Sequence, residues 1–240
     1  MENILVSESY ENSENILDIR NNLSQLIFKD SKDEIISDRH RFCIKFEVDE
    51  KIIRLATKDI ADKIADIIAI QYKYLYFQER LKIGGLNTFS KEILLTALIS
   101  ADLYEDKRYI LSKFKYFNEL AIDGFFNFRL DSLKRKWYEI CSFIPDFFTE
   151  KELKDFVLYL INEKTVRKVR VDGEKVYDRL GNRLRRATLT PGKNLLVFKE
   201  LLLAGVNEVE VFALPSDEIE VKYLKDYFGD KILFNSGEIL

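Results

Sequence analysis

The middle of the sequence, residues 122–144, reads IDGFFNFRLDSLKRKWYEICSFI. Its large apolar side chains recur at intervals of three and four, which is typical of a helix that buries one face. Six of them share that face: Phe126, Leu130, Leu133, Trp137, Ile140 and Ile144. We therefore predict one amphipathic helix over 122–144, ended by Pro145, with Phe126, Leu130, Leu133 and Trp137 in the core.

The helical period extends on both sides, from residue 52 to about residue 163. Ser90 is the predicted N-cap of a helix that begins near it, because a hydroxyl can accept from the free amides of a first turn. Thr149 and Glu152 have the spacing of a capping box at the start of a later helix. Residues 51–163 are therefore predicted to form a helical domain.

The first fifty residues predict a small α/β unit. A short apolar run at 4–6 precedes a polar cluster, and apolar residues then recur at helical spacing from 16 to 27. Residues 42–48 alternate between apolar and polar side chains, as in a half-buried strand. We predict a βαβ unit over residues 1–50.

The last part, residues 164–240, returns to short strands. Two turn signals, at 172–173 and 181–182, predict a β-meander whose third strand covers 184–189. A helix ended by Gly205, a strand at 209–212, a helix over 219–228 and a strand at 232–234 then predict parallel pairing across the crossovers. The predicted fold class is α+β: a small N-terminal βαβ unit, a helical middle, and a C-terminal meander with a small α/β unit.

Composition excludes several classes of protein. The chain has 240 residues, of which 47% are hydrophobic and 33% charged, so a disordered chain is excluded. The net charge of −3 lacks the excess of cations that drives non-specific nucleic-acid binding. The longest charge-free stretch, residues 93–101, is too short to span a membrane, and the acidic N-terminus is unlike a secretory signal. We expect a cytoplasmic protein that does not enter a membrane.

Few residues are available for catalysis. His40 is the single histidine, and the two cysteines, Cys43 and Cys141, are far apart and form no CxxC motif, so we expect free thiols. No phosphate-binding glycine motif is present. We predict no catalytic residues, no metal site and no cofactor.

One segment, residues 164–186, carries an anomalous charge. It holds nine basic and three acidic residues in an otherwise acidic chain. Alternation along the first strand sends Arg167 to the side of Val169 and Val171, and Arg170 to the opposite side. We predict that Arg167, Arg170, Arg183 and Arg185 are binding residues, although these cations could also pair with the acidic stretch after Val206.

A second candidate contact lies in the apolar segment 122–130, where Asn127 and Arg129 are polar. Arg129 is expected at the edge of the buried stripe, with a packed stem and a guanidinium that seeks a carboxylate or helix-end carbonyls. A structural tether and a contact with a ligand both remain open.

The same segment, IDGFFNFRL, carries a family resemblance. With LSKFKYFNEL before it and SLKRKWYEI after it, it resembles the central helical region of YtxC-like proteins, uncharacterised proteins of endospore-forming bacteria. The order of later segments, from KELKDFVLYLINE to NEVEVFAL, is similar as well. The resemblance implies a sporulation-associated cytosolic protein of unknown activity and supplies no catalytic residues.

Two classes of function stay open on the sequence. The first is a non-enzymatic binding or regulatory protein that contacts a protein partner, or a nucleic acid, through residues 164–186. The second is an enzyme with an unfamiliar site in which Arg129 lines a pocket between the helical middle and the C-terminal sheet. We favour a protein partner because the net negative charge would repel a polyanion. The oligomeric state is not predicted.

Overall fold

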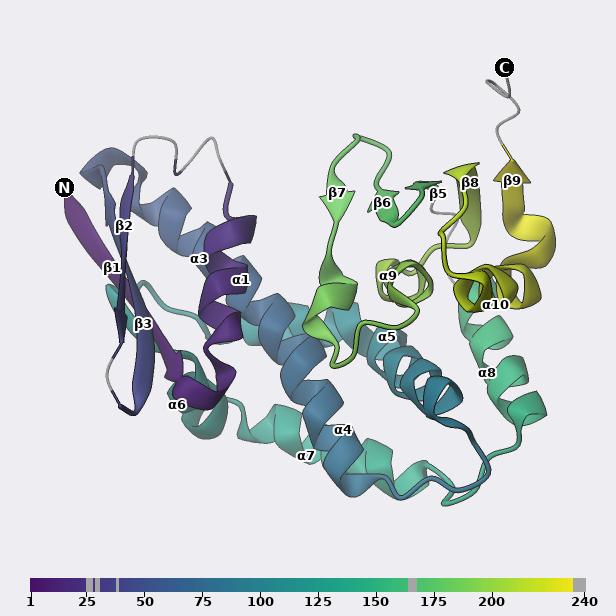
Figure 1. Cartoon of the computed structure of the whole chain (residues 1–240). Coiled ribbons are helices and arrows are strands. Elements are labelled where there is room, and N and C mark those ends of the chain that lie inside the picture. Colours follow the sequence, from purple (N-terminus) through teal and green to yellow (C-terminus); the bar gives the residue numbers. More distant parts are fainter. Residues whose placement is uncertain (25–27, 29–30, 38, 164–167, 235–240) are drawn as a thin grey trace. The chain divides into compact units, whose positions relative to one another are not determined.

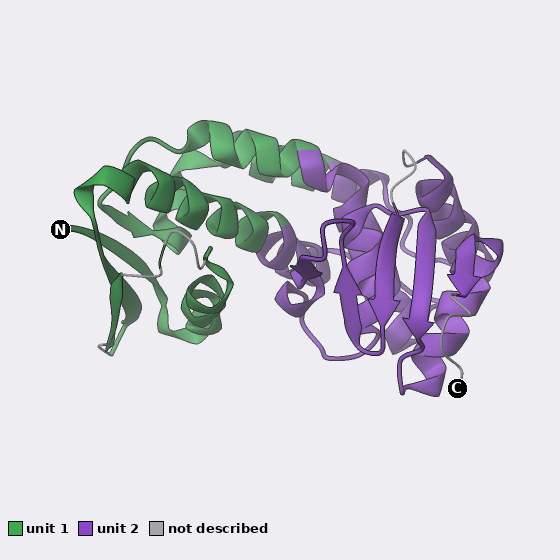
Figure 2. Ribbon diagram, turned by 90° about the horizontal axis from the view of Figure 1, so that it is seen from above, with its two compact units in different colours: residues 1–69, 105–139 green, residues 70–104, 140–240 purple. Residues whose placement is uncertain are grey.

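Helices and strands are interleaved along the chain, which confirms the predicted mixed α+β class. The computed structural model (Figure 1) describes all residues except 25–27, 29–30, 38, 164–167 and 235–240. The chain forms two compact units (Figure 2). Unit 1 comprises Met1–Ala69 and Glu105–Glu139, and unit 2 comprises Ile70–Tyr104 and Ile140–Leu240.

These units differ from the predicted ranges 1–50, 51–163 and 164–240 because the helical middle is divided between them. A short strand inside that middle, β4 (Glu119–Ala121), is the cause for unit 1, since it pairs in parallel with the first strand of the chain. Strand pairing of this kind depends on contacts distant in sequence, which local periodicity does not reveal.

Unit 1 contains a four-stranded sheet in the order β2-β3-β1-β4. The predicted strand–helix–strand unit is present as β1 (Glu2–Ser9), α1 (Glu14–Asn22) and β3 (Arg41–Val48), and β1 and β3 pair antiparallel. Strand β2 (Lys32–Ser37) is an additional edge strand. All six of its residues are exposed, so it lacks the apolar alternation that would have predicted it.

Two helices correct the prediction for residues 122–144. The chain forms α6 (Ile122–Arg129) and α7 (Asp131–Phe143), which are separated at Leu130, where φ is −119° and ψ is 31°. Leu130, Leu133 and Trp137 are buried as predicted, whereas Phe126 is only half-buried and stacks on Trp137 with ring centroids 5.8 Å apart. The break changes the direction of the face, which is why the single stripe predicted for six residues is not continuous.

Although residues 114–118 are not helical, further helices occupy much of the stretch predicted to be helical, from residue 52 to about 163. They are α3 (Ile53–Ile67), a π-helical segment (Ile68–Tyr72), α4 (Lys73–Arg80), α5 (Thr88–Lys113) and α8 (Glu150–Glu163).

Two helix starts test the predicted caps. Asn87 rather than Ser90 caps α5, because the Asn87 side chain accepts from the Ser90 amide at 3.0 Å. The Thr149–Glu152 capping box is confirmed: the Glu152 carboxylate accepts from the Thr149 amide at 2.8 Å, and the Thr149 hydroxyl accepts from the Glu152 amide at 3.2 Å.

Unit 2 contains a five-stranded sheet in the order β7-β6-β5-β8-β9. Its antiparallel half is the predicted meander, with β5 (Lys168–Asp172), β6 (Lys175–Tyr177) and a two-residue β7 (Arg183–Leu184) that is shorter than predicted. Its parallel half is β8 (Glu208–Ala213) and β9 (Ile232–Phe234), so the predicted parallel pairing is confirmed.

Two helices, α9 (Leu196–Ala204) and α10 (Glu218–Phe228), lie on one face of this sheet (Figure 2). Gly205 ends α9 in the left-handed conformation with φ 63°, as predicted for a C-terminal glycine. The valines of β5 and β8 point towards these helices and are buried, which leaves the opposite face of the sheet open.

Candidate binding site

The uncovered side of the unit 2 sheet, which we call the open sheet face, carries the predicted basic residues that lie on strands. Along β5, Val169 and Val171 are buried while Arg170 is exposed, so the predicted alternation is confirmed. Strand register places Arg170 beside Tyr177 on β6 and beside Glu210 on β8, and Tyr177 is in turn beside Arg183 on β7. The open sheet face therefore presents a cross-strand row in the order Arg183, Tyr177, Arg170 and Glu210.

Arg170 is held between two aromatic rings. Its guanidinium carbon lies 4.7 Å from the ring centroid of Tyr177 and 5.3 Å from that of Phe212. Phe212 reaches this position because the β5–β8 register shifts after Val171, which leaves Phe212 without a partner residue on β5. Its side chain is 47% exposed. The two rings attract the cation and restrict its rotamers, so the guanidinium is presented in a fixed place.

The other predicted cations are distributed less regularly. Lys168, at the start of β5, forms an ion pair with Glu210 at 3.3 Å. Arg183 is exposed on β7, and Arg185 is exposed just after that strand. Arg167 lies outside the described residues. The cations of the meander are thus partly neutralised by β8, in agreement with the pairing considered for the acidic stretch after Val206.

Asn127 and Arg129 lie at the end of α6, and both are exposed. The backbone carbonyl of Asn127 accepts from Lys134 Nζ at 2.7 Å. The prediction that the Arg129 side chain packs at the edge of a buried stripe is wrong, because α6 ends at Arg129 instead of continuing into α7. Within the described part of the chain, no carboxylate pairs with Arg129; it lines an open groove together with Phe125 and Phe128.

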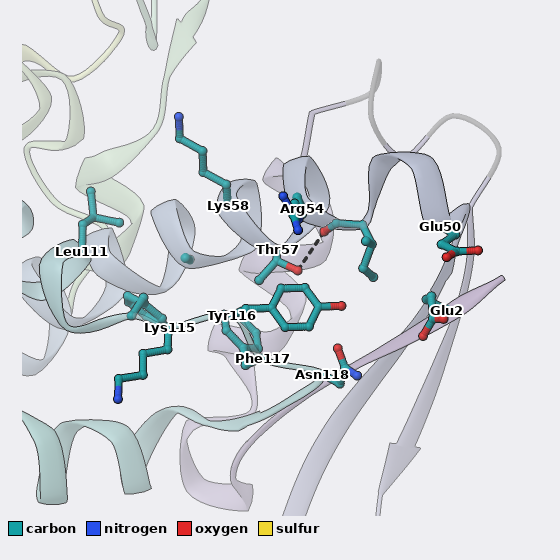
Figure 3. A pocket seen from close by; sticks show the side chains of 13 residues that line it. Glu2, Glu50, Arg54, Thr57, Lys58, Leu111, Lys115, Tyr116, Phe117 and Asn118 are labelled. Carbon is teal, nitrogen blue, oxygen red and sulfur yellow. Dashed lines mark hydrogen bonds between the residues drawn. The ribbon is translucent and has the colours of Figure 1, made fainter.

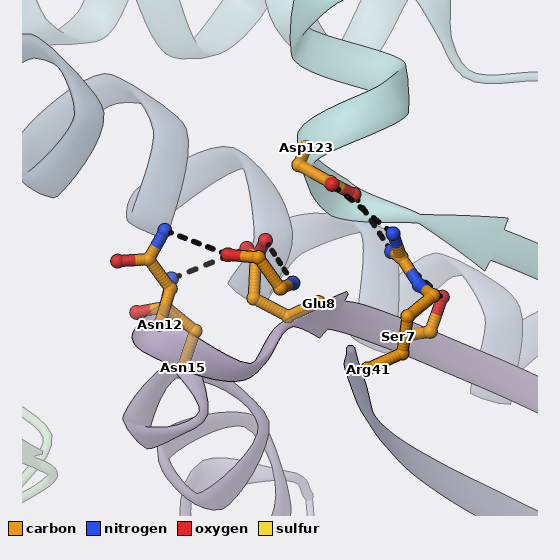
Figure 4. Close-up of polar contacts among 7 residues, drawn as sticks. Ser7, Glu8, Asn12, Asn15, Arg41 and Asp123 are labelled. Carbon is orange, nitrogen blue, oxygen red and sulfur yellow. Dashed lines mark hydrogen bonds and ion pairs between the residues drawn. The ribbon is translucent and has the colours of Figure 1, made fainter. Parts of the chain in front are cut away.

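The carboxylate of this region, Asp123, is bound instead by Arg41 (Figure 4). Arg41 Nη2 and Nη1 donate to the two carboxylate oxygens of Asp123 at 2.7 and 3.1 Å, and Arg41 Nε donates to the Ser7 hydroxyl at 3.2 Å. The hydrogen bond from Arg41 lowers the pKa of Asp123, and the same bond raises the pKa of Arg41. Arg41 was not predicted as a site residue, since its partner is 82 positions away.

A buried carboxylate lies beside this pair. Glu8, at the end of β1, is fully buried, and its oxygens accept from the Ser9 amide at 2.9 Å and from Asn15 Nδ2 at 3.3 Å. Figure 4 shows Glu8 next to Asn15, and the Arg41–Asp123 pair apart from them, near Ser7. Both groups join β1 to the helices around it, so their contacts are those of structural tethers.

The cysteines are the remaining groups with reactive side chains that the sequence analysis considered. Cys43 and Cys141 are half-buried and are not joined by a disulfide, and burial raises the pKa of the Cys141 thiol. Among the described residues there is no group of three His, Cys, Asp or Glu side chains that could hold a metal ion.

Comparison with known proteins found no matching family model, no similar curated protein and no similar solved structure. In the described segments, every helix is too short or too polar to cross a membrane. The resemblance to YtxC-like proteins and the predicted functions stay predictions.

Proposed function

We propose that this chain is a non-enzymatic binding protein that contacts a protein partner through the open sheet face. One observation carries the proposal: the Arg170 guanidinium, held between Tyr177 and Phe212, lies in one row with the exposed Arg183. Tyrosine and arginine are the residue types that contribute most to protein–protein contacts, and a restricted side chain loses little entropy when a partner binds.

The charges of the open sheet face favour a protein over a nucleic acid. A nucleic-acid interface neutralises many phosphates with many cations. Here Lys168 already forms an ion pair with Glu210, and Glu208 lies opposite Lys168 in the strand register. A protein surface with one or two carboxylates beside apolar side chains would complement Arg170, Arg183 and Phe212. We therefore propose a protein partner with an acidic and apolar patch.

The experiment is photo-cross-linking of the partner by a variant of this chain that carries a photo-reactive phenylalanine analogue at position 212. The control is a second variant of the same chain with the analogue in place of Tyr223, on the helical side of the sheet. The resemblance to YtxC-like proteins makes a cytosolic lysate of sporulating cells the source. We expect one polypeptide to be cross-linked from position 212 and not from position 223. Arg183→Glu and Tyr177→Ala should abolish the cross-link, whereas Lys222→Glu, an equal charge reversal on α10, should retain it.

Nucleic-acid binding through the same residues is the second candidate, because Tyr177 and Phe212 could also stack on unpaired bases. It is tested with fluorescent single- and double-stranded RNA and DNA at about 50 and 200 mM salt. Micromolar binding that weakens steeply with salt and is lost on reversal of Arg170, Arg183 and Arg185 would replace the protein partner by a nucleic acid. Cross-linking that is equal at positions 212 and 223 would contradict the protein partner as well.

A further inference from the structure

Unit 1 contains an open groove that is separate from the open sheet face (Figure 3). Its volume is about 1060 Å³, and α3 forms one wall. The opposite wall is the segment that follows α5, residues 114–118. The volume of the groove is at the upper end of the volumes that ligand sites occupy, so the groove can receive a ligand as large as a peptide of several residues.

The floor of the groove is apolar. Ile53 and Ala61 of α3 and Phe117 of the opposite wall are buried. The hydroxyl of Thr57, which also lines the groove, donates to the Ile53 carbonyl at 2.8 Å, so its proton is not directed to a ligand (Figure 3). A ligand would therefore bury apolar groups against this floor.

The charged residues at the rim are ordered along the groove. Glu2 is paired with Val48 in the sheet, and Glu50 follows that position by two residues, so the two carboxylates lie at the same end. Glu50 lies in the 3-10 turn Glu50–Ile52 that precedes α3, and Arg54 and Lys58 follow within α3, one helical turn apart. Figure 3 shows Lys58 and Lys115 at the end away from Glu2 and Glu50.

These five side chains form no ion pair with any residue that the structure describes, so their charges are available to a ligand. The groove has an acidic end, an apolar floor and a basic end. An anionic amphiphile would use the cations and leave both carboxylates without a partner, and a nucleic acid would be repelled by them. A peptide can satisfy both ends, because it can carry both signs of charge on one chain.

We infer that this groove binds an extended peptide segment of a partner protein, with a basic residue at the Glu2–Glu50 end, apolar residues over the floor and an acidic residue at the Lys58–Lys115 end. Glu50 lies in the 3-10 turn Glu50–Ile52 and Lys58 lies in the α-helix α3 that follows it, so we expect about four extended peptide residues, or about 13 Å, to reach from one end to the other. This site lies in unit 1 and does not depend on the function proposed for unit 2.

The experiment uses four pools of fluorescein-labelled peptides, each with four central positions drawn from Leu, Ile, Val and Phe. The flanks are Lys-Lys and Glu-Glu in either order, Lys-Lys on both sides, or Glu-Glu on both sides. Fluorescence polarisation with the full chain should show that one of the two mixed pools binds at least about tenfold more tightly than both uniform pools.

Charge reversal then tests which end of the groove contacts the basic residue of the peptide and which contacts the acidic residue. In the double variant Lys58→Glu with Lys115→Glu, all charges at both ends are acidic, apart from Arg54, and the preference should move to the pool with lysines on both sides. In the double variant Glu2→Lys with Glu50→Lys, the preference should move to the pool with glutamates on both sides. Arg135→Glu, a reversal on the exposed side of α7, should leave the order of the pools unchanged.

Three results would overturn the inference: equal binding of all four pools, no binding at about 1 mM, or an order of pool affinities that the charge reversals do not change. Competition by a fluorescent fatty acid that depends on Lys58 and Lys115 but not on Glu2 and Glu50 would assign the groove to an anionic amphiphile instead. Circular dichroism of each variant checks that it is folded, and all four reversed side chains lie at the surface or partly exposed.

Discussion

Arg41 and Asp123 form a two-pronged ion pair that connects the first residue of β3 to the first turn of α6. The pair fixes the two oxygens of one carboxylate against two nitrogens of one guanidinium, which is the geometry in which arginine differs most from lysine. About a third of each side chain is exposed, so water weakens the attraction.

The first prediction concerns the energy of this pair. A double-mutant cycle with Arg41→Ala and Asp123→Ala should give a coupling energy of about 0.5–1 kcal/mol in urea unfolding. Arg41→Lys should lose most of it, since a lysine cannot hold both oxygens. The matched comparison is the surface pair of Lys45 and Glu47, which makes a single contact. If the coupling energy of Arg41 and Asp123 were no larger than that of Lys45 and Glu47, the two-pronged geometry would contribute nothing.

The second prediction is the pH dependence of the same contact. The pKa of Asp123 is lowered in the folded chain, chiefly by the hydrogen bond from Arg41. A carboxyl with a lowered pKa stabilises the fold above its unfolded pKa of about 3.9, and that contribution is lost as the pH falls through the folded value. Urea unfolding of the wild type should therefore show a steeper loss of stability below about pH 4 than that of Asp123→Asn. Parallel curves would contradict this.

The third prediction concerns Trp137, whose side chain is fully buried on α7 and whose indole Nε1 donates to Asp106 Oδ2 at 2.9 Å. Trp137→Ala should cost about 3–5 kcal/mol, because it opens a cavity. It also removes the indole donor from Asp106. Trp137→Phe, which keeps most of the apolar volume, should cost less, about 1–3 kcal/mol for the unmade hydrogen bond. An emission maximum typical of exposed tryptophan would show that the indole is not buried.

The fourth prediction concerns Glu220 of α10, whose carboxylate accepts from the Phe198 amide in the first turn of α9 at 2.9 Å. Burial raises the pKa of Glu220 despite this bond. The folded state therefore holds the proton more tightly than the unfolded chain, and stability falls as the pH rises from about 4.3 through the folded value. Glu220→Gln keeps an acceptor and removes the charge.

The expected result for Glu220→Gln is a flatter dependence of stability on pH between about 4 and 7 than in the wild type. Glu220→Ala should also flatten the curve, but it should lower stability at every pH by about 1–3 kcal/mol, because the α9 amide loses its acceptor. If the stability of Glu220→Gln depended on pH as steeply as that of the wild type, another titratable group would be responsible for the pH dependence.

The fifth prediction concerns Lys199 of α9, which is fully buried and lies 2.7 Å from a carboxylate oxygen of Glu92 on α5. Glu92→Leu leaves a buried cation without its counter-charge and should cost about 3–5 kcal/mol in unfolding free energy. Adding Lys199→Met should recover part of that loss. The surface change Glu47→Leu, which also removes one member of a pair, should cost at most about 1 kcal/mol.

Local signals predicted the parts of the fold that depend on neighbours in sequence. The capping box at Thr149 and Glu152 and the glycine at 205 act within one helical turn, and both are confirmed. The alternation around Val169 and Arg170 predicted which side of β5 faces the helices, because burial has a period of two in a strand. In the same way, apolar residues at spacings of three and four predicted much of the helical stretch between residues 52 and 163.

Other features depend on contacts that no local pattern contains. The break at Leu130 interrupts a stripe whose spacing continues through it, and β4 is three residues long. The partner of Asp123 is Arg41 rather than the nearby Arg129, and Phe212 reaches Arg170 through a register shift between two strands. The sequence indicated a cation on the meander as a binding residue, but not the aromatic pair that holds it.

The chain leaves unit 1 after residue 69 and returns to it at residue 105. Protein synthesis delivers the N-terminus first, so a nascent chain with 104 residues outside the ribosome has three strands of the unit 1 sheet and lacks β4. The edge of β1 that β4 later covers is then open to pairing with another chain. Translation of the next seventeen residues closes that edge, so the speed of elongation over this stretch controls how long the exposed strand can aggregate.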